Sequence, residues 1–260
     1  MLLKALVVED IPAIREAIVK RISEHPDLQV VAYFDNVEEA TNYFLDGATV
    51  DALFLDIRLF GDYGWEILRS LRREGMTIPP VILITGEEEK GYAETVFQEF
   101  RKEVVDYIVK PFADKWTHRQ NECVRLIKER LRKLQAARPK MNRLPLTRGN
   151  TTEFVPIEEV VCLVKGDAGL EIHFNGDQRR HVDPYGALGS YTKDIHRPNF
   201  VRISRQAVVN IDYVTGYHNG GAKPKALLRH TDVKTIECSK EGFKALRTAL
   251  QFGDSDALPT

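Results

Sequence analysis

The sequence predicts an α/β domain with a doubly wound five-stranded parallel sheet, followed by an elongated, mostly β domain. Two observations predict the first domain. Its apolar runs, such as residues 52–55, lack polar alternation, as is typical of strands covered on both faces, and these runs alternate with helical patterns. One observation predicts the second: beyond residue 144, short apolar stretches are interrupted by Gly, Asn, Asp and Pro about every ten residues.

Length and composition fit a two-domain globular protein. The chain has 260 residues, 43% of them hydrophobic and 29% charged, which excludes a largely disordered protein. No apolar run approaches the ~20 residues of a membrane-spanning helix, and Glu9 and Asp10 interrupt the N-terminal run too early for a signal peptide, so we expect a cytoplasmic protein with no membrane partner. Cys123, Cys162 and Cys238 form no CxxC pair, which favours neither a disulfide framework nor a zinc site.

Charge divides the chain into parts. We predict a first domain at 1–120, a basic helical connector and linker at 121–143, a second domain at 144–252 and a tail at 253–260. The segment 119–143 carries nine Lys and Arg against two Asp and Glu. The connector is therefore either the last helix of the first domain with a solvated outer face, or a longer helix whose basic face lies near nucleic acid.

Five strand–helix units make up the first domain. Strands are expected at 3–8, 30–34, 52–55, 81–84 and 106–109. Helices are expected at 12–24, 36–45, 64–73, 88–103 and 114–135. Pro12 suits the first turn of a helix because its missing N–H needs no partner there, and Ile14, Ile18 and Ile22 form one buried stripe.

Polar residues follow four of these strands directly: Glu9 and Asp10, Asp56, Thr85 and Lys110. Any one of them could be an ordinary strand end exposed to water. Parallel strands bring their carboxyl ends to one edge of the sheet, so together they predict a site. Neighbouring carboxylates favour Mg²⁺, and an Asp beside a metal, a Lys and a Thr is suited to accept a phosphoryl group.

The first domain resembles the receiver domain of two-component response regulators, which have a flavodoxin-like fold. The resemblance is carried, in order, by LVVED at 6–10, LD at 55–56, DYG at 62–64, ITG at 84–86 and YIVKPF at 107–112. It implies that Asp56 is the phosphoacceptor, phosphorylated by a sensor histidine kinase. Glu9, Asp10, Asp56 and the backbone carbonyl of Arg58 would bind Mg²⁺.

The same resemblance gives roles to Thr85 and Lys110, which would hold the phosphoryl oxygens, and to Tyr107, which would be the switch aromatic. The peptide between Lys110 and Pro111 would be cis. Two features depart from the family: Phe60 stands where Pro is common, and the segment between Thr85 and Lys110 is longer, so we expect an extended fourth helix. That helix belongs to the face through which receivers pair, so the mode of dimerisation stays open.

A phosphatase of the haloacid dehalogenase type is an alternative, because it also uses a nucleophilic Asp, a Thr or Ser, a Lys and Mg²⁺. Its Asp-x-Asp motif supplies a general acid, but position 58 here is Arg. We therefore expect a protein that is not an enzyme.

The second domain is predicted to contain short strands and two helices, one between 184 and 195 and one at 240–250. The strands are expected at 154–155, 160–164, 170–174, 180–182, 200–203, 208–210, 214–217, 225–229 and 234–238. Asn175, Gly176 and Asp177 form a plausible hairpin turn. Residues 136–146 are interpreted as linker.

The run FVRISRQAVVNIDYV at 200–214 resembles the central motif of LytTR-type DNA-binding domains, supported by PIEEVV at 156–161 and IECSK at 236–240. By this resemblance Arg205, Lys240 and Lys165 would contact DNA from loops. Ser204 replaces the usual His and the domain has little excess positive charge, so a protein-interaction module without DNA binding is the alternative.

The two resemblances together predict a transcription regulator that is controlled by phosphorylation, binds promoter DNA and forms a homodimer when phosphorylated.

Overall fold

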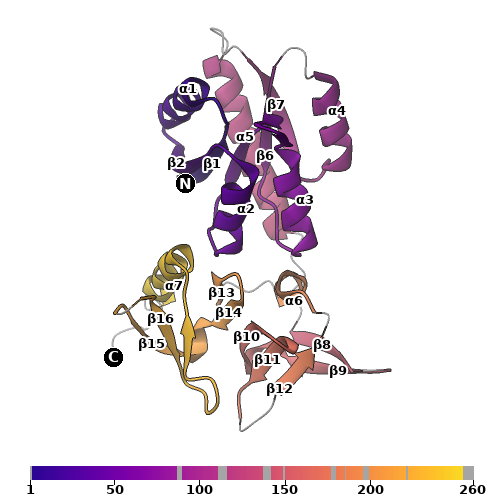
Figure 1. The fold of residues 1–260 in the computed structure, drawn as a ribbon, viewed down its shortest axis with the longest axis vertical. Helices are drawn as coiled ribbons and strands as arrows, with labels where there is room; N and C mark the ends of the chain where they lie inside the picture. The colour runs from indigo at the N-terminus through magenta and orange to yellow at the C-terminus, as the bar shows by residue number, and fades with distance from the viewer. Residues whose placement is uncertain are drawn as a thin grey trace. The chain divides into compact units, whose positions relative to one another are not determined.

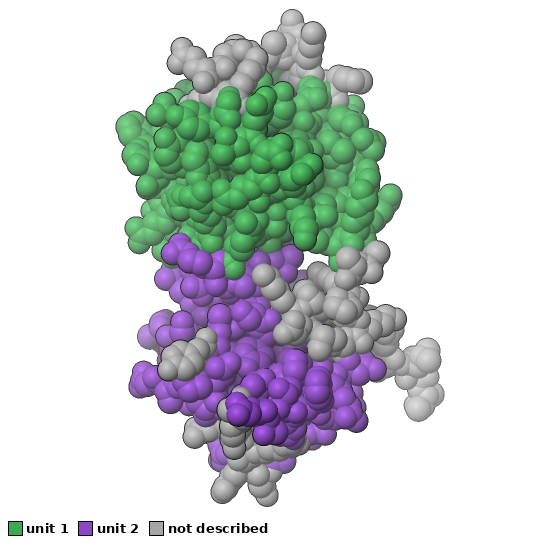
Figure 2. Space-filling view, turned by 90° about the vertical axis from the view of Figure 1, so that its right-hand side faces the viewer, with its two compact units in different colours: residues 1–42, 49–72, 78–138 green, residues 43–48, 73–77, 139–260 purple. Residues whose placement is uncertain are grey.

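The computed structural model describes most of the chain, in two compact units (Figure 2). Unit 1 comprises residues 1–42, 49–72 and 78–138, and unit 2 comprises residues 43–48, 73–77 and 139–260. The described residues are 2–86, 90–110, 116–136, 142–148, 150–176, 180–184, 186–195, 199–220 and 222–253. Among them, no helix is long and apolar enough to cross a membrane.

Unit 1 contains the predicted five-stranded parallel sheet, with strand order β2-β1-β3-β6-β7 (Figure 1). Its strands are β1 (Leu3–Val8), β2 (Leu28–Phe34), β3 (Ala52–Asp56), β6 (Val81–Thr85) and β7 (Val104–Val109). Its helices are α1 (Pro12–Ser23), α2 (Val37–Leu45), α3 (Trp65–Arg73), α4 (Lys90–Glu99) and α5 (Trp116–Ala136). All five residues of β3 and of β6 are buried, as expected for central strands of a doubly wound sheet.

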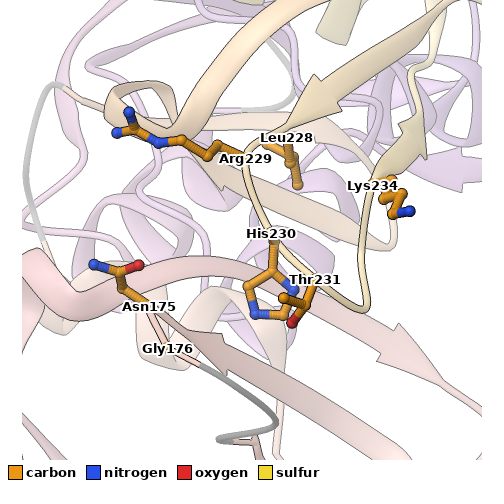
Figure 3. Close-up of a pocket in the computed structure, with 7 residues that line it drawn as sticks. All are labelled: Asn175, Gly176, Leu228, Arg229, His230, Thr231 and Lys234. Carbon is orange, nitrogen blue, oxygen red and sulfur yellow. The ribbon is translucent and has the colours of Figure 1, made fainter.

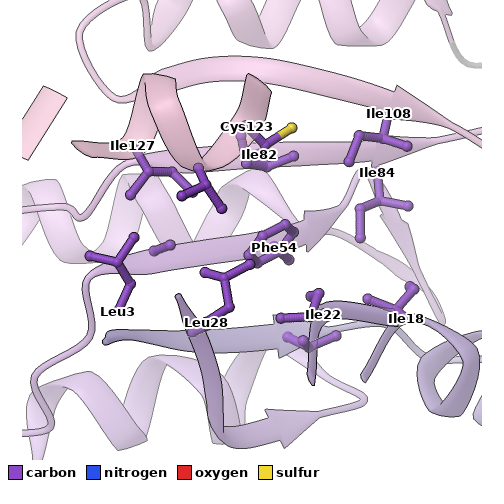
Figure 4. Packing of buried hydrophobic residues seen from close by; sticks show 14 residues of the cluster. Leu3, Ile18, Ile22, Leu28, Phe54, Ile82, Ile84, Ile108, Cys123 and Ile127 are labelled. Carbon is purple, nitrogen blue, oxygen red and sulfur yellow. The ribbon is translucent and has the colours of Figure 1, made fainter. Parts of the chain in front are cut away.

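The core on one face of this sheet is formed by α1, α5 and inward-facing strand residues. Figure 4 shows Ile18 and Ile22 of α1 and Cys123 and Ile127 of α5 around strand residues such as Phe54, all at most 1% exposed. Side chains alternate across a strand, so every second residue of β1 faces this cluster. Burial of these side chains fixes β3 in the middle of the sheet and thereby the place where its last residue emerges.

The expected long helix between Thr85 and Lys110 is shorter than predicted at its C-terminal end. Helix α4 ends at Glu99, and β7 begins at Val104, two residues earlier than expected. The fully buried Phe100 anchors the turn: its N–H donates to Val96 O at 2.8 Å, and its carbonyl accepts the Val104 N–H at 2.8 Å. Residues 87–89 lie outside the described residues, as does Pro111, on which the predicted cis peptide falls.

A short hairpin, which the sequence analysis did not predict, follows β3. It consists of β4 (Arg58–Leu59) and β5 (Asp62–Tyr63), and Gly61 supplies the positive φ of 76° at its turn. Phe60 lies at its tip with 85% of its surface exposed.

Unit 2 is mostly β, as predicted. Its largest sheet is antiparallel with the order β12-β11-β10-β14-β13, and two smaller sheets contain β15-β16-β17 and β8-β9. The strands are β8 (Arg143–Arg148), β9 (Thr151–Pro156), β10 (Val160–Gly166), β11 (Gly169–Phe174), β12 (Arg180–Asp183), β13 (Phe200–Ser204), β14 (Ala207–Asn210), β15 (Val214–His218), β16 (Lys225–Leu228) and β17 (Thr235–Glu237). The helices are α6 (Leu188–Ile195) and α7 (Lys240–Gly253). Two single turns of 3-10 helix, 157–159 and 211–213, connect strands.

Strand β8 shows that the last part of the predicted linker at 136–146, residues 143–146, is a strand instead. Leu144 and Leu146 are buried, whereas Arg143 and Thr147 are exposed, which is the alternation of a half-buried strand. Pro145 lies between the two leucines and lowers the strand signal, because proline cannot donate to a ladder.

Candidate functional site

Three carboxylates meet at the carboxyl edge of the parallel sheet. Glu9 and Asp10 follow β1 and Asp56 ends β3, and each offers an oxygen within 4.8 Å of the others. Glu9 is 0% and Asp56 3% exposed. Buried like charges at this distance repel one another and favour a hard cation. An all-oxygen set with few protein ligands suits Mg²⁺, so the residues present fit this metal.

Lys110 brings one positive charge into this acidic cluster. Its Nζ lies 2.7 Å from Asp56 Oδ2 and 2.7 Å from Glu9 Oε2. Burial alone would lower the pKa of Lys110, but its bonds to Asp56 and Glu9 raise it, so the ammonium stays charged. The Lys110 N–H donates to Thr85 O at 2.8 Å, which aligns the ends of β6 and β7 beside Asp56.

Burial changes the acidity of Glu9 in the metal-free site. Burial, reinforced by the charge of Asp56 and opposed by Lys110, raises the pKa of Glu9 from 4.5 to about 7. Between pH about 4.5 and 7, the Glu9 carboxyl is therefore protonated in the folded protein, whereas it would lose its proton in the unfolded chain.

We expect this difference to make the metal-free protein less stable as pH rises. The native state binds more protons than the unfolded chain between pH about 4.5 and 7, so the free energy of unfolding should fall across that window by up to ~3 kcal/mol. Urea unfolding in EDTA at several pH values measures it. Glu9→Gln should flatten the slope and Glu38→Gln, at an exposed position of α2, should not; equal slopes in wild type and Glu9→Gln would contradict the assignment.

The other residues predicted for this site lie close to it in different ways. Thr85 is fully buried at the end of β6, and its Oγ1 donates to Gly86 O at 3.1 Å. The Arg58 N–H lies 3.4 Å from Asp56 Oδ1, so its backbone stays beside the carboxylate. Tyr107 lies three residues before Lys110 in β7 with 43% of its surface exposed, which places its ring on the surface of the unit.

Gly64 allows the chain to pass closely behind Asp56. A Cβ at this position would lie 2.0 Å from the Asp56 carbonyl oxygen and 2.9 Å from Leu55 Cδ1. The Gly64 N–H also donates to Ile57 O at 3.0 Å, so the backbone cannot simply move away.

We therefore expect Gly64→Ala to lower the free energy of unfolding by about 1–3 kcal/mol, since it forces a buried clash. Gly91→Ala is the matched control, because nothing lies within 4 Å of an added Cβ in α4 and alanine favours a helix. Denaturant unfolding of both variants measures the difference. Equal stabilities would show that the backbone behind Asp56 relaxes freely.

Arg15, to which no sequence pattern assigned a role, lies against the loop that carries Glu9 and Asp10. Its Nη1 donates to Glu9 O at 2.7 Å and to Asp10 O at 3.2 Å. The available signal was its position in the first turn of α1, because helical side chains point back toward the N-terminus.

In unit 2, the three residues predicted to contact DNA come from neighbouring turns. Lys165 is exposed at the β10–β11 turn and Arg205 at the β13–β14 turn, and these turns are joined by the bond from Lys165 N to Gln206 O at 2.7 Å. Lys240 is exposed at the start of α7, directly after Ser239, whose N–H donates to Ile203 O at 2.8 Å. Three cationic side chains thus lie at one end of the sheet.

A cavity of about 660 Å³ lies at the other end of β11 from Lys165 (Figure 3). Its lining consists of Asn175, Gly176, Leu228, Arg229, His230, Thr231 and Lys234. His230 is fixed, since its Nδ1 accepts the N–H groups of Asp232 and Val233 while Nε2 lies 3.1 Å from Phe174 O. Figure 3 shows the side chains of Arg229 and Lys234 extending away from His230 on opposite sides. The two cationic side chains that line the cavity therefore do not converge on one position for a ligand.

Comparison with protein families assigns both units. Residues 5–119 match the response regulator receiver domain, and residues 150–251 match the LytTr DNA-binding domain. Both matches are to domains of response regulators. They exclude the phosphatase of the haloacid dehalogenase type, which was the alternative because it uses the same types of residue.

Several curated relatives match this chain along most of their own length. The sensory transduction protein LytT of Bacillus anthracis is 25% identical over 221 residues, covering 82% of this chain and 85% of the relative. LytT of Enterococcus faecalis is 26% identical over 216 residues, covering 79% and 81%. The transcriptional regulatory protein LytR of Staphylococcus aureus is 23% identical over 218 residues, covering 82% and 85%. This chain belongs to the two-component response regulators that join a receiver domain to a LytTR DNA-binding domain.

Proposed function

We propose that this regulator accepts a phosphoryl group on Asp56 from a sensor histidine kinase and thereby controls the binding of promoter DNA by its LytTR domain. The observation that carries the proposal is the position of the Lys110 ammonium, 2.7 Å from both Asp56 and Glu9, among three carboxylates at the edge of the sheet. A nucleophilic carboxylate, a fixed cation and a metal-binding acid pair are the groups that aspartyl phosphorylation needs.

The transfer uses the residues of this site in defined roles. A carboxylate oxygen of Asp56 forms a bond to phosphorus while the bond from phosphorus to the donor's histidine nitrogen breaks, and the imidazole leaves with that electron pair. Glu9, Asp10, Asp56 and the Arg58 carbonyl would hold Mg²⁺, which supplies charge neutralisation at the phosphoryl oxygens. Lys110, whose Nζ already lies 2.7 Å from Asp56 Oδ2, would bind those oxygens, and the Thr85 hydroxyl would join it by exchanging its bond to Gly86 O for one to a phosphoryl oxygen.

Phosphorylation adds about −1.5 to −2 charges at this edge of the sheet. Drawing Thr85 and Lys110 toward the new oxygens changes the ends of β6 and β7, and Tyr107 lies on the exposed side of β7. We propose that this change promotes a homodimer and that Arg205, Lys240 and Lys165 contact DNA, with the protein acting in the cytoplasm where promoters and kinases meet. Sedimentation with and without beryllofluoride, a phosphoryl mimic, tests the dimer; equal sedimentation would contradict it.

The proposed function is tested with the purified full-length chain, acetyl phosphate and a pool of genomic DNA fragments. We expect the protein to incorporate one phosphoryl group, and EDTA to prevent this. We also expect the protein to retain DNA fragments that share a sequence, and to retain more of them when it is phosphorylated. Failure to incorporate phosphate would contradict the receiver role. Retention of fragments without a shared sequence would contradict promoter recognition.

A further inference from the structure

Arg15 connects α1 to the loop that carries two of the three site carboxylates. Its guanidinium donates from Nη1 to the carbonyls of Glu9 at 2.7 Å and Asp10 at 3.2 Å. The same group lies over the ring of Tyr33 on β2, 5.8 Å from its centroid. Arg15 is half-buried, so water competes less with these contacts than at a fully exposed position.

The loop depends on side chains because its own secondary structure fixes it incompletely. Helix α1 begins with Pro12 at its first turn, and Ile11 before it makes no side-chain capping hydrogen bond. Backbone bonds hold the loop at Glu9 N, which donates to Phe34 O at 3.1 Å. Between that bond and the helix, Arg15 holds the carbonyls of Glu9 and Asp10, while the Glu9 carboxylate is also held by the Ile11 N–H at 3.3 Å and by Lys110 Nζ at 2.7 Å. Rotation about the peptide between Asp10 and Ile11 would swing the Asp10 carboxylate away from Asp56.

We propose that Arg15 is a positioning residue for the metal ligands: by holding two consecutive carbonyls it fixes the Glu9 and Asp10 carboxylates in the arrangement that binds Mg²⁺ beside Asp56. This inference rests on the proposed phosphoryl-accepting function. Arg15 contacts neither the Asp56 side chain nor Lys110 in the bonds described above, so its effect passes through the ligand loop. Groups that orient metal ligands in this way commonly change metal affinity by about 10- to 100-fold.

The test measures Mg²⁺ binding directly and phosphorylation separately. For Arg15→Ala we expect the Kd for Mg²⁺, measured by isothermal titration calorimetry with the full-length protein, to rise about 10-fold. The Mg²⁺ concentration for half-maximal phosphorylation by acetyl phosphate should rise by the same factor, while the rate at saturating Mg²⁺ stays within about twofold of wild type, because the reacting groups are unchanged.

Two further variants separate positioning from folding. Arg15→Lys keeps the charge, but its side chain is shorter and has no guanidinium plane to lie over Tyr33, so it should restore only part of the affinity. Arg21→Ala, which removes a charge near the other end of α1, is the control and should leave the Kd unchanged. Thermal melting in EDTA confirms that each variant is folded.

The outcomes divide cleanly. An unchanged Mg²⁺ Kd in folded Arg15→Ala, or a lowered rate at saturating Mg²⁺ with unchanged Kd, would overturn the positioning role while the proposed function stands. Wild-type protein that binds Mg²⁺ but accepts no phosphoryl group would instead overturn the proposed function. A weakened Kd with a preserved saturating rate, partly recovered in Arg15→Lys, supports the inference.

Discussion

Asp56→Asn is expected to abolish phosphoryl incorporation from acetyl phosphate, the largest effect of any single substitution in this protein. An amide is a poor nucleophile, and it also loses the charge that holds Lys110 Nζ at 2.7 Å from Asp56 Oδ2. Intact-protein mass spectrometry should detect the added phosphoryl group in wild type with Mg²⁺ and none in the variant. The amide has almost the same size as the carboxylate, so the buried site should still fold.

The matched control is Asp51→Asn, near the other end of the same strand. Asp51 Oδ2 accepts the Lys4 N–H at 2.8 Å, and an amide oxygen can keep that bond. This variant should be phosphorylated like wild type. Persistent labelling of Asp56→Asn would place the phosphoacceptor elsewhere, and loss of labelling in Asp51→Asn would show that the assay reports stability rather than chemistry.

Much of the receiver site could be predicted because it depends on strand ends. Continuous apolar runs identify buried parallel strands, and the residues after them must meet at one edge whatever the details of the helices. For this reason the sequence alone predicts that Glu9, Asp56 and Lys110 lie together, as the structure shows. The role of Arg15 could not be predicted in this way. It depends on the reach of one side chain from the first turn of a helix to the preceding loop, and no periodic pattern in the sequence indicates such a contact.

The ends of helices and strands are predicted less well where one residue determines where the element ends. The C-terminal end of α4 is set by the burial of Phe100, a tertiary contact that helix propensity does not contain. The hairpin of β4 and β5 has two residues per strand, too few for an alternating pattern. Strand β8 was hidden by Pro145. In each case the local signal was weak and packing decided the structure.

The second large effect is expected at the end of the LytTR domain that we propose to contact DNA. Arg205 is exposed on the β13–β14 turn, which is joined to Lys165 by the bond from Lys165 N to Gln206 O at 2.7 Å. Lys240 is exposed at the first residue of α7, next to Ser239, whose N–H donates to Ile203 O at 2.8 Å. An arginine that pairs with a base contributes about 1–3 kcal/mol to the discrimination between the preferred base and other bases. A lysine that neutralises a phosphate instead strengthens binding to every DNA sequence by about the same amount. Arg205→Ala should therefore reduce sequence preference, and Lys240→Ala should weaken binding uniformly.

The salt dependence of affinity distinguishes these two roles. With a fragment recovered from the genomic pool, Lys240→Ala should lower the slope of log K against log salt by about 1, and the double variant should lose at least about 10-fold in affinity for that fragment. The matched control is the double variant Arg229→Ala with Lys234→Ala, which also removes one arginine and one lysine, but at the other end of β11. If the control loses as much affinity as the double variant, the domain binds DNA through general positive charge rather than through the turns at Arg205 and Lys240. Loss confined to the Arg205 and Lys240 variants would place the nucleic acid at the end of the domain where two turns and the start of α7 each contribute one cation.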